Sequence, residues 1–404
     1  MNTKTYFLLA LIPALAAPLT HTSASPLVSI GDHADLFFNG SSSLRWTSNL
    51  FRDEDDEEDD LVWTVSPGLE LNIGRGQSNA DFSVITRYDI LMYEDNDDLD
   101  TELFHIKALG AYQTSRWDVD GELSFDERQT TTGDANVDAD LIESDETQAK
   151  LNGEYRLSPK FSFGAGVHYF DKEYTSYEDQ LADYERWSLP FNLYYELTPK
   201  VDLSVGYTYS MRDVSSYTQE SGDVIGGYDT ETHFLNVGAR GELLPKLTGF
   251  FKVGYTVRDS DDSTNIIGGS PVAKERNDND GTLGLDADLT WAQTPKLTHN
   301  LMLHRGFGVG GEGDATTVSK IDVASGYAIN PFWSASSSLG YTLREYEDNN
   351  GREDDQIYLG LSGDYTPNRF WRFSLGYRYS ENDSNEDNRS YEDHSITFVA
   401  SLRY

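Results

Sequence analysis

Apolar and polar residues alternate along most of the chain after Ser29. Between positions 201 and 211, every odd position is Val, Leu, Tyr or Met, and every even position is Asp, Ser, Gly or Thr. A period of two indicates an extended strand with one apolar face and one polar face. The same pattern recurs at 117–125, 187–197 and 371–380. Most of the chain is therefore expected to be β-strand.

The connections between these segments are of two alternating kinds. Long, polar, acidic connections include 52–60, 259–280 and 380–389. Short connections contain proline, which presets a turn and cannot sit in the middle of a paired strand; these are the turns at Pro159, Pro199, Pro245, Pro295, Pro331 and Pro367. Short turns at one end and long loops at the other are typical of outer-membrane barrels. A β-propeller has a similar repeat length, but its blades hold four short strands, whereas each period here holds two long ones.

No segment after the N-terminal region has the apolar length of about 20 residues that a transmembrane helix needs. Lipid cannot form hydrogen bonds with the unpaired backbone groups of an open sheet edge. If the chain enters a membrane as strands, it must therefore form a closed barrel. We therefore predict an all-β fold, a transmembrane antiparallel up-and-down β-barrel of about 18 strands, with 16 as the alternative if a stretch near 81–112 is misread. The expected strands are 34–50, 61–73, 81–93, 102–112, 116–128, 147–157, 160–172, 185–197, 200–212, 231–243, 246–258, 281–292, 296–308, 318–329, 332–345, 355–366, 369–380 and 392–404.

Composition agrees with a barrel and excludes several other classes. The net charge is −38, from 69 acidic and 31 basic residues, which argues against nucleic acid as a partner. Aromatic content is 13% although hydrophobic content is only 38%, as expected for a lipid-facing band around a watery lumen. The chain has no cysteine, so disulfides, thiolate metal sites and thiol catalysis are excluded.

Both chain ends carry expected targeting features. Lys4 precedes an apolar run at 6–17 and a region of small residues, which predicts a signal peptide at 1–24 with cleavage after Ala24; a retained helical anchor is the alternative. Residues 25–404 are then expected to form a single barrel domain in the outer membrane. The last strand alternates up to an aromatic terminus, with Phe398, Leu402 and Tyr404 on one face. This looks like the C-terminal signal that barrel assembly machinery recognises, although that signal more often ends in Phe; a plain amphipathic strand is the alternative.

The segment from Ser48 to Phe125 resembles β-barrel porin families found beside exopolysaccharide loci. The resemblance rests on the pieces SNLFR at 48–52 and VSPGLEL at 65–71, and on Tyr88 and Tyr93 before the acidic run 94–100. It implies an outer-membrane barrel that is a channel, with no assigned substrate, surrounded by outer-membrane lipid and lipopolysaccharide.

Two groups of charged residues are candidates for lining a pore. One group shares lumen parity near the upper ends of its strands: Arg212, Arg258, Arg344 and Arg378. These arginines could form a basic ring that selects solutes, or they could pair with acidic residues and hold the loops down. The other group lies on one strand, at Asp118, Asp120 and Glu122. It could be a charged ladder at a constriction, with its negative charges balanced by lysines on neighbouring strands, or an ordinary solvated wall.

No cofactor, metal site or catalytic residue is expected. The acidic stretches 278–281 and 348–351 do not fit a calcium-binding loop, so solvated loops are the expectation and calcium binding stays open. The eight histidines form no HExxH motif, and no GxSxG motif occurs.

The leading prediction for function is a porin-like channel for passive diffusion of small hydrophilic solutes, weakly cation-selective. One alternative is a barrel component of exopolysaccharide export or surface assembly that passes a glycan; rows of aromatic side chains in the lumen would favour it. A further alternative is a plugged structural or adhesive barrel.

Overall fold

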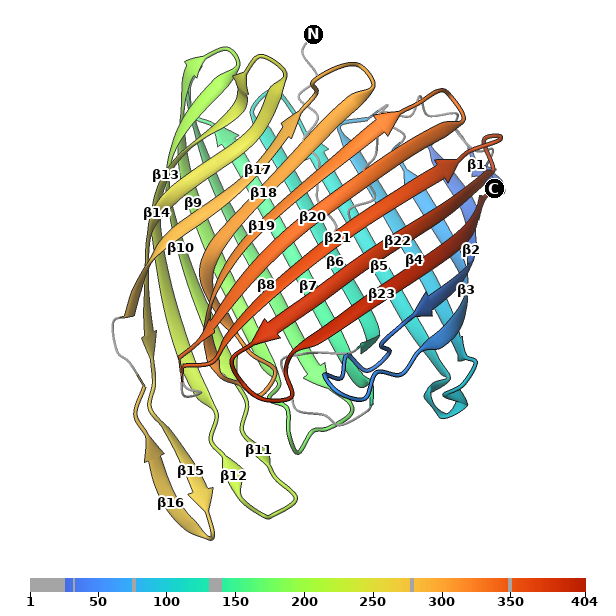
Figure 1. The fold of residues 1–404 in the computed structure, drawn as a ribbon. Coiled ribbons are helices and arrows are strands. Elements are labelled where there is room, and N and C mark those ends of the chain that lie inside the picture. Colours follow the sequence, from blue (N-terminus) through green and yellow to red (C-terminus); the bar gives the residue numbers. More distant parts are fainter. Residues whose placement is uncertain (1–25, 32, 75–77, 131–139, 277–279, 348–350) are drawn as a thin grey trace.

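The computed structural model describes residues 26–404 except 32, 75–77, 131–139, 277–279 and 348–350. The expected signal peptide at 1–24 lies outside the described residues. The fold is a closed antiparallel barrel of 18 strands, which confirms the predicted fold class and excludes the alternative of 16 (Figure 1). The barrel strands are β2 (Ala34–Thr47), β3 (Asp60–Ile73), β4 (Ala80–Tyr93), β5 (Thr101–Gln113), β6 (Trp117–Thr130), β7 (Ile142–Arg156), β8 (Phe161–Tyr174), β9 (Tyr184–Thr198), β10 (Val201–Val214), β13 (Tyr228–Leu244), β14 (Leu247–Ser260), β17 (Asp280–Trp291), β18 (Leu297–Val309), β19 (Ala315–Ala328), β20 (Trp333–Tyr346), β21 (Glu353–Tyr365), β22 (Trp371–Ser384) and β23 (Tyr391–Arg403).

Each barrel strand pairs with its sequence neighbour, and β2 and β23 close the ring. Their register runs from Asn39 opposite Arg403 to Thr47 opposite Ser395. The first and last barrel strands therefore lie side by side, and the barrel has no open edge.

Several strands extend further toward the long loops than the sequence predicts. β7 begins at Ile142 rather than near 147, and β22 continues to Ser384 rather than 380. Backbone pairing continues above the apolar band, but there both faces of a strand meet water, so the alternation that marks a strand in the sequence disappears.

Two loops form a small sheet outside the barrel, at the loop end (Figure 1). It consists of β11 (Tyr217–Thr218), β12 (Val224–Ile225), β15 (Ser263–Ile267) and β16 (Ser270–Lys274). Gly268 and Gly269 join β15 to β16 with φ of 58° and 78°. A two-residue turn with both φ angles positive favours glycine and matches the twist of a hairpin. The sequence predicts only a long, polar, acidic connection at 259–280 here. Two minor elements complete the fold, β1 (Val28–Ile30), which pairs with β2, and the 3-10 turn η1 (Asp97–Leu99).

The outer face is an apolar band between two aromatic belts. In β10 the odd positions face outward, and Val205 is 56% exposed whereas its neighbour Ser204 is 7% exposed. Rings pair across strands near the short turns, as in Trp333 and Tyr365 with centroids 4.6 Å apart, and near the loops, as in Tyr169 and Trp187 at 4.7 Å. Rings with a polar tip suit both membrane interfaces. Among the described residues, no helix is long and apolar enough to cross a membrane.

Candidate functional site: the lumen wall and its mouth

The predicted acidic ladder on β6 lies on the lumen face, and each of its carboxylates has a polar neighbour. Asp118 and Asp120 accept hydrogen bonds from Gln113 Nε2 at 3.1 Å and from Asn152 Nδ2 at 2.9 Å. Glu122 is 8% exposed, and its Oε1 lies 2.6 Å from Lys107 Nζ. These contacts tie the ladder into the wall, and Lys107 offsets the charge of Glu122.

A salt bridge joins two strands of the lumen wall that are not neighbours. Arg240 on β13 binds Glu154 on β7 with both terminal nitrogens, at 2.6 and 2.8 Å, and lies 3.1 Å from Asp202 on β10. Its guanidinium also stacks 3.5 Å above the ring of Tyr194. Bidentate pairs of this kind are strong and directional. Sequence reasoning missed this bridge, because the contact depends on how tightly the wall curves.

Three clusters of buried apolar side chains lie at the loop end of the barrel. Consecutive residues join the clusters through the backbone. Leu141 of the first cluster precedes Ile142 of the second, and Leu181 of the second precedes Ala182 of the third. Together they form what we call the mouth core, made of Leu50, Val62, Tyr93, Leu141, Ile142, Tyr174, Leu181, Ala182, Val214 and Tyr228. Loops supply four of these ten residues, at 50, 141, 181 and 182. Parts of these loops therefore pack against the strand ends at the mouth.

The loop between β18 and β19, residues 310–314, reaches across this mouth; we call it the mouth loop. Gly311 O accepts from Ala182 N at 3.1 Å, and Gly313 O accepts from Tyr228 Oη at 2.9 Å. Gly313 has φ of +81°, and a Cβ there would lie 2.9 Å from the Cβ of Ala182, so a side chain would force the loop away.

Charged contacts hold the mouth loop from the other side. Glu312 Oε1 lies 2.7 Å from Arg389 Nη2, and the Arg389 side chain is 4% exposed. Burial, together with the charges of Glu312 and Asp314, raises the pKa of the Tyr217 hydroxyl to about 12. The mouth loop is thus anchored in an environment where charges are largely shielded from water.

The four predicted arginines do not share one environment. Arg258 is 2% exposed, lies 3.3 Å from Asp280, contacts Glu347, and stacks 4.2 Å above Phe307. Arg344 donates to Tyr346 Oη at 3.4 Å. Arg378 lies deeper along its strand, is exposed, and stacks 4.4 Å above Tyr358. Arg212 stacks 6.0 Å above Tyr184. A scaffold role suits Arg258, whereas selection of solutes by the four arginines together stays a prediction.

Sequence analysis also missed Arg186 on β9. It faces the lumen directly opposite Arg212 on β10 and is exposed. The alternation of the segment 184–198 places Arg186 at lumen parity, and that signal was available in the sequence.

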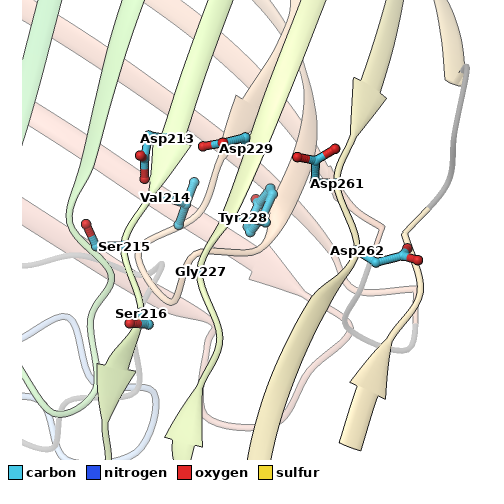
Figure 2. A pocket seen from close by; sticks show the side chains of 9 residues that line it. All are labelled: Asp213, Val214, Ser215, Ser216, Gly227, Tyr228, Asp229, Asp261 and Asp262. Carbon is cyan, nitrogen blue, oxygen red and sulfur yellow. The ribbon is translucent and has the colours of Figure 1, made fainter.

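An acidic cleft of about 500 Å³ lies on the loop side of the barrel (Figure 2). Asp213 and Asp229 are direct partners on β10 and β13, and Asp261 N donates to Asp229 O at 2.9 Å. Within the described ranges, no group of three or more His, Cys, Asp or Glu side chains is arranged to hold a metal ion. The stretches considered for calcium fall mostly outside the described residues, at 278–279 and 348–350; Asp280 is described and pairs with Arg258.

Residues 39–404 match the model of the family described as "Putative beta-barrel porin 2". The chain belongs to this family. The resemblance seen in the sequence is thereby confirmed, and this porin-family barrel is an integral outer-membrane protein. A search of curated proteins finds no match.

Solved structures similar to the porin-family barrel share little sequence with it. The ferric-catecholate import receptor Fiu from E. coli K12 is 10% identical with a TM-score of 0.49, covering 95% of this chain and 82% of that one. The outer membrane protein OpdK from Pseudomonas aeruginosa is 12% identical with a TM-score of 0.44, covering 92% and 99%. The siderophore receptor PiuA from Acinetobacter baumannii is 9% identical with a TM-score of 0.47, covering 91% and 82%.

Proposed function

We propose that the porin-family barrel is a channel for passive diffusion of small hydrophilic solutes, with a weak preference for cations and no chemistry of its own. The observation that carries the proposal is the polar character of the lumen face. Neighbouring strands present small polar residues there, for example Ser336, whose Oγ lies 2.6 Å from that of Ser362. Such a wall suits hydrated solutes. The proposal includes removal of residues 1–24, insertion by the barrel assembly machinery, and a surround of outer-membrane lipid and lipopolysaccharide.

The proposed cation preference comes from the loops. Several wall charges are paired, as in Lys107 with Glu122 and Arg372 with Asp364 at 2.9 Å, so they offset one another. The loops hold unbalanced runs such as DEDDEEDD at 53–60. These negative charges raise the cation concentration near the mouth, and salt screens them over about 8 Å at physiological ionic strength.

In planar bilayers with a KCl gradient, we expect a reversal potential of the sign that indicates K⁺ preference. Its magnitude should decrease as total salt rises, because the loop charges lie in water. Neutralising the loop carboxylates at 53–59 should reduce it further. Anion preference at low salt would contradict the proposal. It would indicate that the luminal arginines determine the ion selectivity.

The mouth loop should limit conductance. Glu312→Ala removes its contact with Arg389, so we expect a larger or more frequently open single-channel conductance than in the unmodified protein. Glu57→Ala, which removes an exposed loop carboxylate, is the matched control and should leave the conductance unchanged. Equal conductances for all three proteins would mean that the mouth loop does not border the path.

The packed mouth favours a second candidate, a plugged structural or adhesive barrel. Absence of any KCl conductance, including in Glu312→Ala, would support that candidate instead of a channel. Glycan export gains no such support. Among the described lumen aromatics, cations cover the rings of Tyr194, Tyr358 and Phe170, which leaves fewer ring faces for sugars.

A further inference from the structure

Two arginines face each other across neighbouring strands in the lumen. The register of β9 and β10 makes Arg186 and Arg212 direct Cα partners, on the same face of the wall. Direct partners in an antiparallel pair lie about 5 Å apart at Cα, and like charges in that arrangement repel. The pair therefore costs stability unless something negative lies beside it.

Among the described residues, no carboxylate forms an ion pair with Arg186 or Arg212. Several other luminal arginines do have a carboxylate partner. Arg240 has Glu154 and Asp202, Arg258 has Asp280 and Glu347, and Arg403 has Glu70 at 2.7 Å. The contacts that Arg186 and Arg212 make are with rings, Phe170 at 5.7 Å and Tyr184 at 6.0 Å. In a protein with 69 acidic residues, the lack of a carboxylate beside two adjacent arginines is unexpected.

One nitrogen of the pair is buried without a hydrogen-bond acceptor. Arg212 Nε is shielded from solvent and has no partner among the described residues, whereas the Arg186 side chain is exposed toward the lumen. An unsatisfied donor on a charged group carries a large desolvation cost. An acceptor from outside the chain would remove that cost.

The surroundings of the pair add positive charge, and the side chains next to it on the lumen wall are short. Lys150 adds to the positive charge around Arg186, and Arg258 adds to that around Arg212. The next lumen pair along the two strands is Ser188 and Ser210, whose Oγ atoms lie 2.8 Å apart. Short side chains beside two guanidinium groups make room for a ligand there.

We propose that Arg186 and Arg212 bind the anionic group of a solute, a carboxylate or a phosphate. The planar fork of donors on each guanidinium matches the oxygens of both groups. The inference rests on the proposed function, because the solute reaches the pair through the lumen, and it names the class of solute that the channel holds. It is compatible with a weak cation preference, because a bound anion offsets the charge of the pair.

The test is isothermal titration calorimetry of the refolded, detergent-solubilised protein at low ionic strength. The probes are glucose 6-phosphate and glucuronate, with glucose as the neutral control. We expect both anions to bind and glucose not to bind. Arg186→Gln and Arg212→Gln should each weaken binding about tenfold or more, the loss expected for charge-assisted hydrogen bonds.

Arg372→Gln is the matched control, since it removes one luminal arginine from another part of the wall, where it pairs with Asp364. It should bind both anions as the unmodified protein does. Heat-modifiable mobility on gels verifies that each variant is folded. Unchanged binding in the two pair variants, equal losses in Arg372→Gln, or no anion binding in the unmodified protein would each overturn the proposed site.

Conductance in KCl distinguishes a failure of the proposed anion site from a failure of the channel proposal. Anion binding without conductance would leave the site standing and overturn the channel. Conductance without anion binding would overturn the site and leave the channel standing.

Discussion

Removal of β23 is expected to abolish the folded barrel. The strand pairs with β22 along one edge and with β2 along the other, from Asn39 opposite Arg403 to Thr47 opposite Ser395. Without it, β2 and β22 would each present unpaired backbone groups to lipid, where nothing else can bond them. The truncated chain, ending before residue 391, should show no heat-modifiable band on gels and no surface yield.

Tyr404→Ala should reduce insertion less than the truncation does. Tyr404 exchanges backbone hydrogen bonds with Phe38 at 2.6 and 2.9 Å, and these survive the substitution, but its ring loses the contact with Phe370 at 5.6 Å. Deleting 28–30 is the matched control, because β1 pairs with β2 outside the closed ring. That deletion should leave the barrel folded. A normal surface yield after removal of β23 would show that closure by this strand is dispensable.

Leu375→Arg is expected to lower the free energy of unfolding by about 2–4 kcal/mol, the cost of a cation near the bilayer midplane. Leu375 is 58% exposed on the outer face, on β22 between Phe373 toward the short turns and Tyr377 toward the loops. Its surroundings are lipid, which offers no partner for the charge. Urea-induced unfolding in lipid vesicles measures the difference from the unmodified protein.

Ser374→Arg is the control, one residue away on the opposite face. Ser374 Oγ donates to Asp364 Oδ1 at 2.6 Å, so an arginine there loses that bond but gains a carboxylate and water. We expect a loss of less than about 1 kcal/mol, as for a solvated ion pair. Equal losses at the two positions would mean that the inner and outer faces have been assigned the wrong way round.

The sequence predicts the barrel wall well, because lipid on one side and water on the other impose a period of two on each strand. Positions 201–211 identify both faces of β10, and the proline turns identify one end of the barrel. The sheet of β11, β12, β15 and β16 was missed, although the Gly268-Gly269 pair between apolar residues is a recognised hairpin signal. The added lengths of β7 and β22 could not be predicted, since both of their faces are polar above the membrane.

The candidate site was less predictable than the wall. Lumen parity predicts that Asp118, Asp120 and Glu122 lie on the inner face, but it does not predict the hydrogen-bond and salt-bridge partners of these residues. The pairing of Arg186 with Arg212 depends on the two-residue turn at 199–200 and on a register shift between Val201 and Asp202, without which Arg212 would face Trp187. By contrast, the bridge from Arg240 to Glu154 joins strands separated by three others, and no local pattern encodes the curvature that brings them together.

The position of the mouth core bears on where this barrel can carry added sequence. Loops usually accept inserted peptides because little is packed against them. Here residues 141–142, 181–182 and 310–314 make buried contacts. A peptide inserted at any of these positions would disrupt the packing of the loops at the mouth. Surface display should instead use Gly268-Gly269, where a Cβ would meet nothing within 4 Å. That hairpin tip projects beyond the barrel, so a displayed epitope would stand clear of the membrane and leave the passage below it intact (Figure 1).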